Sequence, residues 1–451
     1  MEMRCVKFKQ YRKKNMKGLH SFFLFSLPCN ITFIYFFSFF LLYSYMAAPP
    51  PPVVNGPVIA GYFANWGIYA RNYNVIDLAH NADRLTHILY AFANIEPSGQ
   101  VVLGDKWADT DKHFSPEQSV DGKGDPWSEN DTENLFGNFK QLYLLKRKYR
   151  HLKVSLSIGG WTWSTNFAAV ANDPQKRALF VQSAIKHLAD LGLDGIDIDW
   201  EYPKNEQEAL SYVHLLYEVR LALDAYQQQV QQTNQPRLTL SVAVPCGPSQ
   251  YRILRLRDMA PYVDLFYLMA YDFAGSWDAQ TGHQSALYGE GLNCHQAISD
   301  YIAAGVPPQK LVMGMPAYGR AFSNTSGPGA AFQGVPEGSW EKGQYDYKAL
   351  PRPGAQEFND PNRCMSWSYD PQQREFVTYD SPVIVQAKCD YIKQAQLGGA
   401  MFWELSADHP RDHPRSLVQT VYQNLGHLDS MPNHLDYPAS QYANMRASMN
   451  S

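Results

Sequence analysis

Short runs of β-branched and aromatic residues recur along this 451-residue chain, and segments with helical periodicity separate them. The runs lie at 58–64, 87–94, 153–158, 195–200, 238–244, 265–271, 310–315 and 399–403. Helical segments between them include 134–150, 174–191 and 206–231. Strands that alternate with helices predict a parallel sheet, and eight such units predict an α/β fold that closes into a (β/α)8 TIM barrel. We expect this barrel to span residues 57–425.

One interval does not show this alternation of strands and helices. Residues 321–390 hold no clear helix, but they contain many glycines, prolines and aromatic residues and short strand-like pieces such as 376–379. We expect a small α+β insertion subdomain between the seventh and eighth strands. Residues 426–451 are polar and short of core residues, and they predict a loosely packed tail.

The N-terminus carries seven lysines and arginines between residues 4 and 17, followed by an apolar run over 21–46. This order predicts a signal peptide or signal anchor at 1–46, with a Pro-rich linker at 47–56. We expect a secreted, extracellular protein. The alternatives are a protein anchored by the N-terminal segment and an intracellular protein that starts at Met46. The acceptor triplets at Asn130 and Asn324 are compatible with export.

Charge and cysteine usage narrow the function classes. The net charge of −4 gives no reason to expect a nucleic-acid partner, and we expect a monomer. No two of the six cysteines form a Cys-x-x-Cys pair, and the histidines lack metal-ligand spacing, so no metal or cofactor is expected. Four cysteines lie in the body of the chain and allow up to two disulfides of undetermined pairing: Cys246, Cys294, Cys364 and Cys389.

Residues 194–202 have the sequence Asp-Gly-Ile-Asp-Ile-Asp-Trp-Glu-Tyr, in which acidic and apolar residues alternate. On a strand, Asp197, Asp199 and Glu201 would point to one face, with neighbours about 7 Å apart. Like charges this close in an interior raise at least one pKa. A carboxylic acid that stays protonated beside charged carboxylates is what acid catalysis of glycosidic bond cleavage requires. The alternative, a solvated acidic strand, is disfavoured by the flanking isoleucines and Trp200.

Barrel enzymes carry their chemistry at the C-terminal ends of the strands. Chemically useful residues gather at these predicted ends, namely Tyr62, Trp66, Phe92, Gly159, Gly160, Trp161, Met269, Tyr271, Asp272 and Trp403. The sequence therefore predicts an aromatic-rich site at this end of the barrel.

These segments resemble glycoside hydrolase family 18. Asp194, Asp197, Asp199 and Glu201 match the family signature Asp-x-x-Asp-x-Asp-x-Glu at all four acidic positions. Residues 155–160, 269–272, 315–320 and 399–403 resemble further family blocks in the same order, and the likeness runs from about 58 to 425. The whole is similar to a fungal-type chitinase with the inserted subdomain of that branch.

The resemblance implies a chitinase that hydrolyses β-1,4-linked N-acetylglucosamine polymers by retaining, substrate-assisted catalysis through an oxazolinium ion. Glu201 would be the general acid and base. Asp199 would accept a hydrogen bond from the acetamido N–H, and Asp197 would share a proton with Asp199. Tyr271 would donate its hydroxyl to the acetamido oxygen, and Trp403 would form the floor under the sugar.

Other residues are assigned by position or by the resemblance. Further substrate contacts are expected at Trp161, Tyr62, Phe92, Met269, Asp272, Tyr202 and Arg320. Asp272 and Arg320 have a structural ion pair as their alternative, while Tyr62, Phe92 and Met269 have barrel packing. Asp194 lies off the parity of the acidic row and is expected to be structural, as are Gly159 and Gly160. Stacking platforms along a cleft are expected at Trp66, Trp161, Trp277 and Trp340.

Two other functions stay open. Non-catalytic chitin-binding lectins with this barrel typically lack the last acid of the signature, whereas Glu201 is present here. An endo-β-N-acetylglucosaminidase acting on N-glycans shares the signature, but the insertion and the Trp-rich loops favour a deep groove for linear chitin. The implied partners are chitin and chitooligosaccharides, with a membrane only through an uncleaved N-terminal segment.

Overall fold

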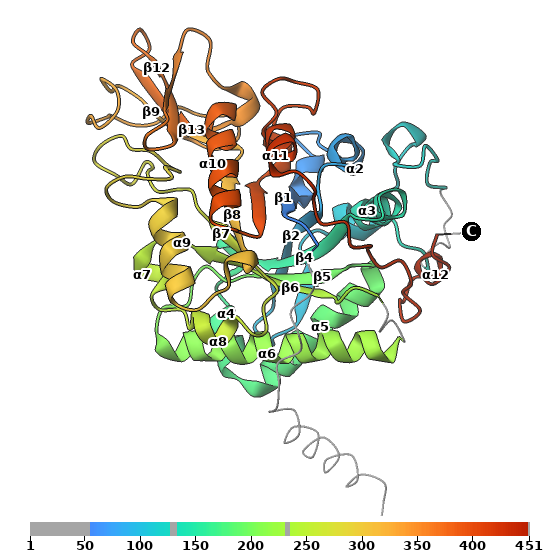
Figure 1. The fold of residues 1–451 in the computed structure, drawn as a ribbon. Coiled ribbons are helices and arrows are strands. Elements are labelled where there is room, and N and C mark those ends of the chain that lie inside the picture. Colours follow the sequence, from blue (N-terminus) through green and yellow to red (C-terminus); the bar gives the residue numbers. More distant parts are fainter. Residues whose placement is uncertain (1–54, 127–132, 231–234, 450–451) are drawn as a thin grey trace, which may run out of the picture. The chain divides into compact units, whose positions relative to one another are not determined.

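A computed structural model describes residues 55–126, 133–230 and 235–449. Eight parallel strands form a closed barrel in the order β1, β14, β8, β7, β6, β5, β4 and β2, and pairing of β1 with β2 closes it (Figure 1). Their bounds are β1 Val58–Ala64, β2 His87–Ile95, β4 Lys153–Gly159, β5 Gly195–Asp199, β6 Thr239–Pro245, β7 Leu265–Met269, β8 Leu311–Pro316 and β14 Gly399–Trp403. The predicted (β/α)8 barrel is confirmed, and every strand ends within two residues of its predicted bounds. A short strand β3, Val101–Leu103, pairs antiparallel with β2.

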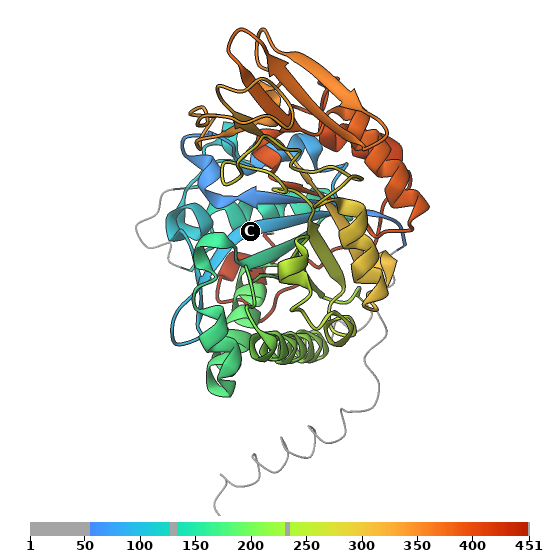
Figure 2. The same cartoon turned by 90° about the vertical axis from the view of Figure 1, so that its left-hand side faces the viewer.

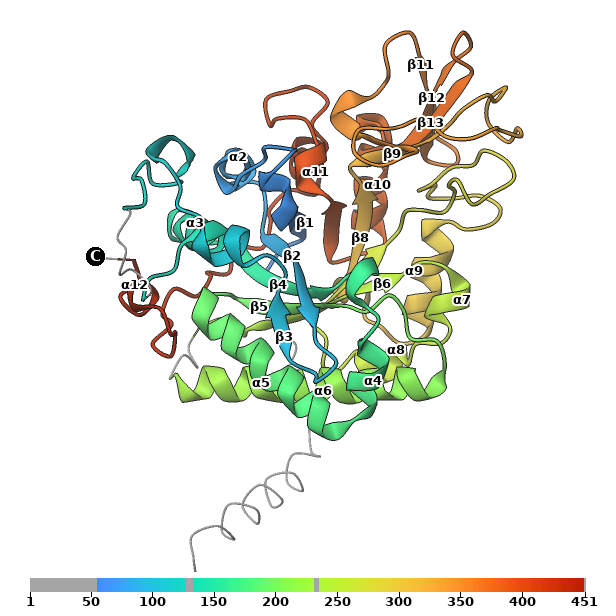
Figure 3. The same ribbon diagram turned by 180° about the vertical axis from the view of Figure 1, so that it is seen from behind.

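Helices cover the outside of the barrel, as Figures 1 and 3 show. Their bounds are α2 Val75–Leu78, α3 Gly137–Lys148, α4 Phe167–Asn172, α5 Pro174–Leu191, α6 Glu206–Gln229, α7 Pro248–Tyr251, α8 Leu256–Met259, α9 Cys294–Ala303, α10 Pro382–Gln394, α11 Leu417–Leu425 and α12 Ala443–Arg446. The start of α5 follows from its sequence, because the Asp173 side chain accepts the backbone N–H groups of Gln175 and Lys176. Gly192 ends this helix in the left-handed region, at φ 72°.

The core has two parts, because the strands are buried on both faces. Inside the barrel, a cluster that includes Tyr62, Leu89, Tyr267 and Met401 fills the lumen. Between strands and helices, a larger cluster holds the residues of opposite parity, among them Ile196 and Ile198 of β5. The lumen is therefore a packed core, and chemistry is possible only at its ends.

A five-stranded antiparallel sheet in the order β10, β9, β13, β12, β11 follows β8 directly, and it stands beside the barrel in Figure 2. Its strands are β9 Tyr318–Phe322, β10 Gln344–Asp346, β11 Gln356–Asp360, β12 Met365–Asp370 and β13 Glu375–Tyr379. The insertion between the seventh and eighth barrel strands is confirmed, although its sheet begins at Tyr318. Since β9 continues from the carboxyl end of β8, the sheet rises on the side where the acidic row ends.

The expectation of no clear helix in 321–390 was wrong, because α10 begins at Pro382, within this interval, and packs against α11 and β14. Ser381 caps it by accepting the Ile384 N–H. Its buried face includes Lys388, whose Nζ lies 2.5 Å from Oδ2 of Asp380. A lysine on the inner face interrupts the apolar periodicity, so the sequence pattern did not reveal the helix.

The expectation of a loosely packed tail after residue 425 was also wrong. Asn433 and Tyr437 are buried, and the Asn433 amide donates to the carbonyls of Lys146 and Leu152 at 2.9 and 2.7 Å. Asp429 forms a 2.7 Å ion pair with Lys153 at the start of β4. The polar side chains of the tail thus satisfy groups at the N-terminal end of the barrel, and polarity in the sequence did not mean exposure.

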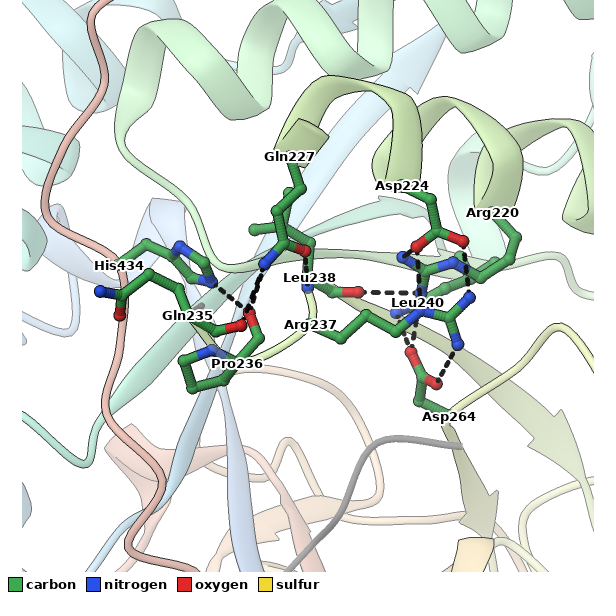
Figure 4. Close-up of polar contacts among 10 residues, drawn as sticks. All are labelled: Arg220, Asp224, Gln227, Gln235, Pro236, Arg237, Leu238, Leu240, Asp264 and His434. Atoms are coloured by element: carbon green, nitrogen blue, oxygen red, sulfur yellow. Dashed lines mark hydrogen bonds and ion pairs between the residues drawn. The ribbon is translucent and has the colours of Figure 1, made fainter. Parts of the chain in front are cut away.

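An ion-pair network with Arg220 and Asp264 at its buried centre joins α6 to the starts of β6 and β7 (Figure 4). Arg220 lies 3.0 Å from Asp264 and 2.7 Å from Asp224, and Arg237 lies 2.6 Å from Asp224. His434 of the tail reaches the neighbouring loop, with Nε2 2.7 Å from the Pro236 carbonyl oxygen. Charged and polar contacts therefore fix the barrel end opposite the acidic row.

The cysteines and the possibility of a membrane segment were also raised by the sequence. The four cysteines of the barrel and insertion are buried and free, so neither of the disulfides that the sequence allowed is formed. Among the described residues, no helix is both long enough and apolar enough to cross a membrane. The predicted leader, the linker up to residue 54 and the Asn130 triplet lie outside the described residues.

Candidate active site

Strand β5 brings the acidic row to the mouth of the barrel with the predicted parity. Asp197 and Asp199 are buried on the inner face, while Ile196, Ile198 and Trp200 pack in the outer core. Glu201 follows the strand end and is partly buried. The solvated-strand alternative is therefore excluded, and three carboxyl groups share one end of the barrel.

Asp197 is surrounded by hydroxyl donors from the two strands beside β5, which are β4 and β6, and from β1 across the lumen. Ser157 and Ser241 each donate to it at 2.7 Å, and the Tyr62 hydroxyl donates at 3.2 Å. Burial raises the pKa of Asp197, and these hydrogen bonds oppose the shift.

Sequence reasoning missed Ser157 and Ser241 as site residues. A signal for them existed in the strand register, because both serines are the direct lateral partners of Asp197 on β4 and β6. Lateral neighbours in a sheet point to the same face. Once the barrel order is assumed, the register places both hydroxyl groups beside the carboxylate.

Asp199 has the opposite environment. Its Oδ1 atom is buried and has no hydrogen-bond partner. Burial raises the pKa of Asp199 well above its usual value, and the charges of Glu201 and Asp197 raise it further. A buried carboxyl oxygen without a donor is costly, so this atom is suited to receive one from a bound molecule. The proton that we expect Asp197 and Asp199 to share stays a prediction.

Glu201 has the pKa of a group that exchanges protons near neutral pH. Burial raises the pKa of Glu201 to about 7, and the nearby charge of Asp272 adds to the shift. Hydrogen bonds from Tyr202 and from the Trp161 backbone N–H oppose it. A carboxyl group with this pKa can serve as an acid in one step and as a base in the next.

Aromatic rings surround the mouth of the barrel. The Trp403 ring lies 5.1 Å from Tyr62 and 5.7 Å from Phe92 between centroids, and it is nearly parallel to Phe92 at 20°. Phe92 stacks in turn on Trp66 at 6.2 Å. Tyr271 packs at the edge of Tyr318. Burial raises the pKa of Tyr271, and the charge of Asp199 raises it further. The predicted residues at the ends of β1, β2, β7 and β14 therefore do converge.

Two residues expected to contact substrate, Asp272 and Arg320, bind each other. Arg320 donates to Asp272 through Nε at 2.9 Å and through Nη2 at 2.7 Å, and the Tyr318 hydroxyl donates at 2.6 Å. The guanidinium group also lies over the Trp277 ring, 5.1 Å from its centroid. Asp272 and Arg320 therefore form the structural ion pair that the sequence had left open as the alternative to substrate contact. A contact of either residue with substrate stays a proposal. Met269 is partly exposed at the end of β7.

Gly159 and Gly160 let the loop after β4 approach the end of β5. Their φ angles are 114° and 80°, and a Cβ atom on Gly159 would lie 2.2 Å from the Asp199 carbonyl oxygen. The Gly160 N–H donates to that same oxygen at 2.8 Å. Directly after this contact the loop presents Trp161, whose side chain is 76% exposed.

The other predicted stacking platforms, Trp66, Trp277 and Trp340, are also exposed. Trp340 donates through Nε1 to Asp346 at 3.0 Å, and Arg71 lies 3.0 Å from Asp346 and 3.3 Å from Glu404. This network joins the loop after β1, the insertion and the end of β14. Sequence reasoning missed it, because Arg71 is 275 residues from Asp346 and the members form no local pattern.

Asp194 lies away from the acidic row, at the opposite end of β5. Its carboxylate accepts the N–H groups of Val154 and His434 at 2.8 Å, and Lys146 Nζ lies 2.7 Å away. Every one of these contacts is structural, in agreement with the role expected from its parity. Within the described ranges, no group of three or more His, Cys, Asp or Glu side chains is arranged to hold a metal ion.

Comparison with known proteins identifies this architecture. The chain is 45% identical over 402 residues to Endochitinase 1 of Metarhizium robertsii, covering 88% of this chain and 91% of that protein. It is 44% identical over 403 residues to Chitinase 1 of Aphanocladium album, with coverages of 88% and 92%. The catalytic domain of chitinase B from Arthrobacter TAD20 superposes with a TM-score of 0.75 at 31% identity, covering 85% of this chain and 99% of that one. The family model "Glycosyl hydrolases family 18" matches residues 58–408, and the chain therefore belongs to that family.

Proposed function

We propose that this protein is a chitinase that cleaves β-1,4-linked N-acetylglucosamine polymers with retention, using the substrate's own acetamido group as the nucleophile. Family membership and the similarity to the two fungal chitinases make it a glycoside hydrolase of chitinase type. The observation that carries the mechanism is the acidic row. A carboxyl group with a pKa of about 7 lies beside a buried carboxyl oxygen that has no hydrogen-bond donor.

In the first step, Glu201 gives its proton to the glycosidic oxygen while the C1–O bond breaks. The acetamido oxygen of the same sugar bonds to C1 and closes an oxazolinium ion, so no protein carboxylate attacks. Burial supports this role, because it keeps a substantial fraction of Glu201 protonated near neutral pH.

Asp199 orients the attacking group. Its unpartnered Oδ1 accepts the acetamido N–H, and its negative charge stabilises the positive charge that develops on the ring. Asp197, held by Ser157 and Ser241, lies next in the row and steers Asp199 through a shared proton. Tyr271 donates its hydroxyl to the acetamido oxygen, and Trp403 forms the apolar floor under the sugar.

In the second step, the ionised Glu201 takes a proton from a water molecule that attacks C1 from the face of the departed chain. The oxazolinium ring opens, and the product keeps the β configuration because two inversions have occurred. Exposed tryptophans at the mouth, Trp161 and Trp277 among them, supply stacking surfaces for further sugars of a linear chain.

Chitin hexamer tests the proposal directly. Proton NMR during the first minutes of hydrolysis should show the β anomer in the new reducing ends, before mutarotation produces the α form. An α product at the earliest times would exclude participation of the acetamido group. Binding of the hexamer without any cleavage would favour a chitin-binding lectin, and cleavage of N-glycan cores in preference to chitin would favour a glucosaminidase.

Export is a separate proposal. The basic and apolar order of residues 1–46 supports cleavage near residue 47 and release of a monomeric enzyme. Expression of the full chain with a C-terminal tag in a fungal host should place the tagged protein in the medium, with a new N-terminus near residue 47. Recovery in the membrane pellet would indicate an anchor, and recovery in the cytosol would indicate an internal start at Met46.

A further inference from the structure

The loop after β4 holds the end of β5 through a serine that neither the sequence motifs nor the mechanism above includes. Ser164 Oγ accepts the backbone N–H of Glu201 at 2.8 Å. The same hydroxyl group donates to the Gly160 carbonyl oxygen at 2.9 Å, and it lies 3.3 Å from the Asp199 carbonyl oxygen. One buried hydroxyl group thus connects both sides of the junction from which Glu201 projects.

The segment 160–164 grips Glu201 at two levels. Ser164 fixes its main chain, and the Trp161 backbone N–H lies near enough to its carboxyl group to lower the pKa of Glu201. The Gly160 N–H also donates to the Asp199 carbonyl oxygen at 2.8 Å. The Ser164 hydroxyl group and the Trp163 N–H both donate to the Gly160 carbonyl oxygen. Loss of the hydroxyl group would therefore weaken this turn as well as the bond to the Glu201 main chain.

We propose that Ser164 is a positioning residue for proton transfer, which sets where the Glu201 carboxyl group lies relative to the glycosidic oxygen. This inference rests on the proposed function of Glu201. No other backbone acceptor is placed for the Glu201 N–H in the described chain, so removal of the Ser164 hydroxyl group leaves that donor unsatisfied. A displacement of about 1 Å is enough to lower a rate about 100-fold when proton transfer is concerted with bond cleavage.

Two substrates with different leaving groups distinguish a misplaced acid from a general loss of active-site structure. A sugar leaving group needs protonation, whereas 2,4-dinitrophenolate leaves without it. In Ser164→Ala, kcat/KM for chitin pentamer should fall by about 10- to 100-fold, and kcat/KM for 2,4-dinitrophenyl β-chitobioside should change by less than about threefold. Ser164→Thr, which keeps the hydroxyl group, should have a kcat/KM for chitin pentamer close to that of the wild type. Equal losses on both substrates, or no loss on either, would overturn the proposal.

Ser183 provides a matched control. It is as buried as Ser164, accepts the Val101 N–H at 2.9 Å and donates to the Leu179 carbonyl at 2.7 Å, but it lies on α5. Ser183→Ala should leave kcat/KM unchanged for both substrates. If Ser164→Ala does not fold, the nearly isosteric pair Ser164→Thr and Ser164→Val makes the same comparison, since only the hydroxyl group differs. Normal cleavage by Glu201→Gln would reject the proposed function itself. If Glu201→Gln is inactive but Ser164→Ala loses the same factor of kcat/KM on both substrates, only this inference is rejected.

Discussion

Replacement of Asp194 by alanine tests whether the first acid of the signature is structural. The side chain has almost no solvent exposure and forms an ion pair with the equally buried Lys146 at 2.7 Å. It also accepts the N–H groups of Val154 and His434, one from β4 and one from the tail. Asp194→Ala therefore leaves a buried ammonium group and two buried N–H groups without this partner.

Removal of one member of a buried ion pair typically costs about 3–5 kcal/mol. Burial already lowers the pKa of Lys146, and Asp194 is the charge that opposes this shift. We take about 4 kcal/mol as the loss, because the Lys146 ammonium group retains the Gly192 carbonyl as an acceptor at 2.7 Å. With an unfolding entropy of about 2 cal/mol/K per residue over about 400 residues, this loss lowers Tm by about 5 °C.

Calorimetry and steady-state kinetics provide the assay. Tm should fall by about 5 °C, while kcat/KM for chitin pentamer at 25 °C should stay within about threefold of the wild type. Asp83→Ala is the control, because Asp83 pairs with Arg411 on the surface and should cost less than about 1 kcal/mol. An unchanged Tm with a loss of activity near 100-fold would refute the structural assignment and place Asp194 in the catalytic machinery.

Three other predictions concern the mouth of the barrel. Because burial raises the pKa of Glu201 to about 7, the acid form is lost as pH rises, and the alkaline limb of kcat/KM should lie near pH 7; a limb near pH 9 would contradict this. Ser157→Ala and Ser241→Ala each remove a hydrogen bond that lowers the pKa of Asp197, so this pKa should rise and the acidic limb should move to higher pH, and an unmoved limb would argue that Asp197 does not take part. Trp161→Ala should leave Tm unchanged because the ring is exposed, while hydrolysis of crystalline chitin falls about tenfold; equal rates on chitin would remove Trp161 from the substrate path.

The barrel was predictable because its signals are local. Strands buried on both faces must be short apolar runs, and the row Asp197, Asp199 and Glu201 shows its shared face through period-2 alternation. The same logic placed Asp194 outside the row. It would also have found Ser157 and Ser241 if lateral register had been applied across β4, β5 and β6.

The errors share a physical origin, which is the burial of polar groups by tertiary contacts. The tail is polar because the side chains of Asn433 and His434 hydrogen-bond to backbone carbonyl groups at the floor of the barrel, and helix α10 buries a lysine that pairs with Asp380. Asp272 and Arg320 form the ion pair that the sequence had left open as an alternative, and their contact with substrate stays a prediction. Such pairings depend on which segments meet in space, and no local pattern encodes them.

The central claim is that Glu201 supplies and recovers the proton. Glu201→Gln keeps the size and hydrogen-bonding capacity of the side chain but removes its exchangeable acidic proton. Turnover of chitin pentamer should fall at least about 1,000-fold, while the Kd for the same oligomer, measured by titration calorimetry, should stay within about threefold of the wild type. Turnover within tenfold of the wild type would contradict the account and leave a carbohydrate-binding barrel whose acid lies elsewhere.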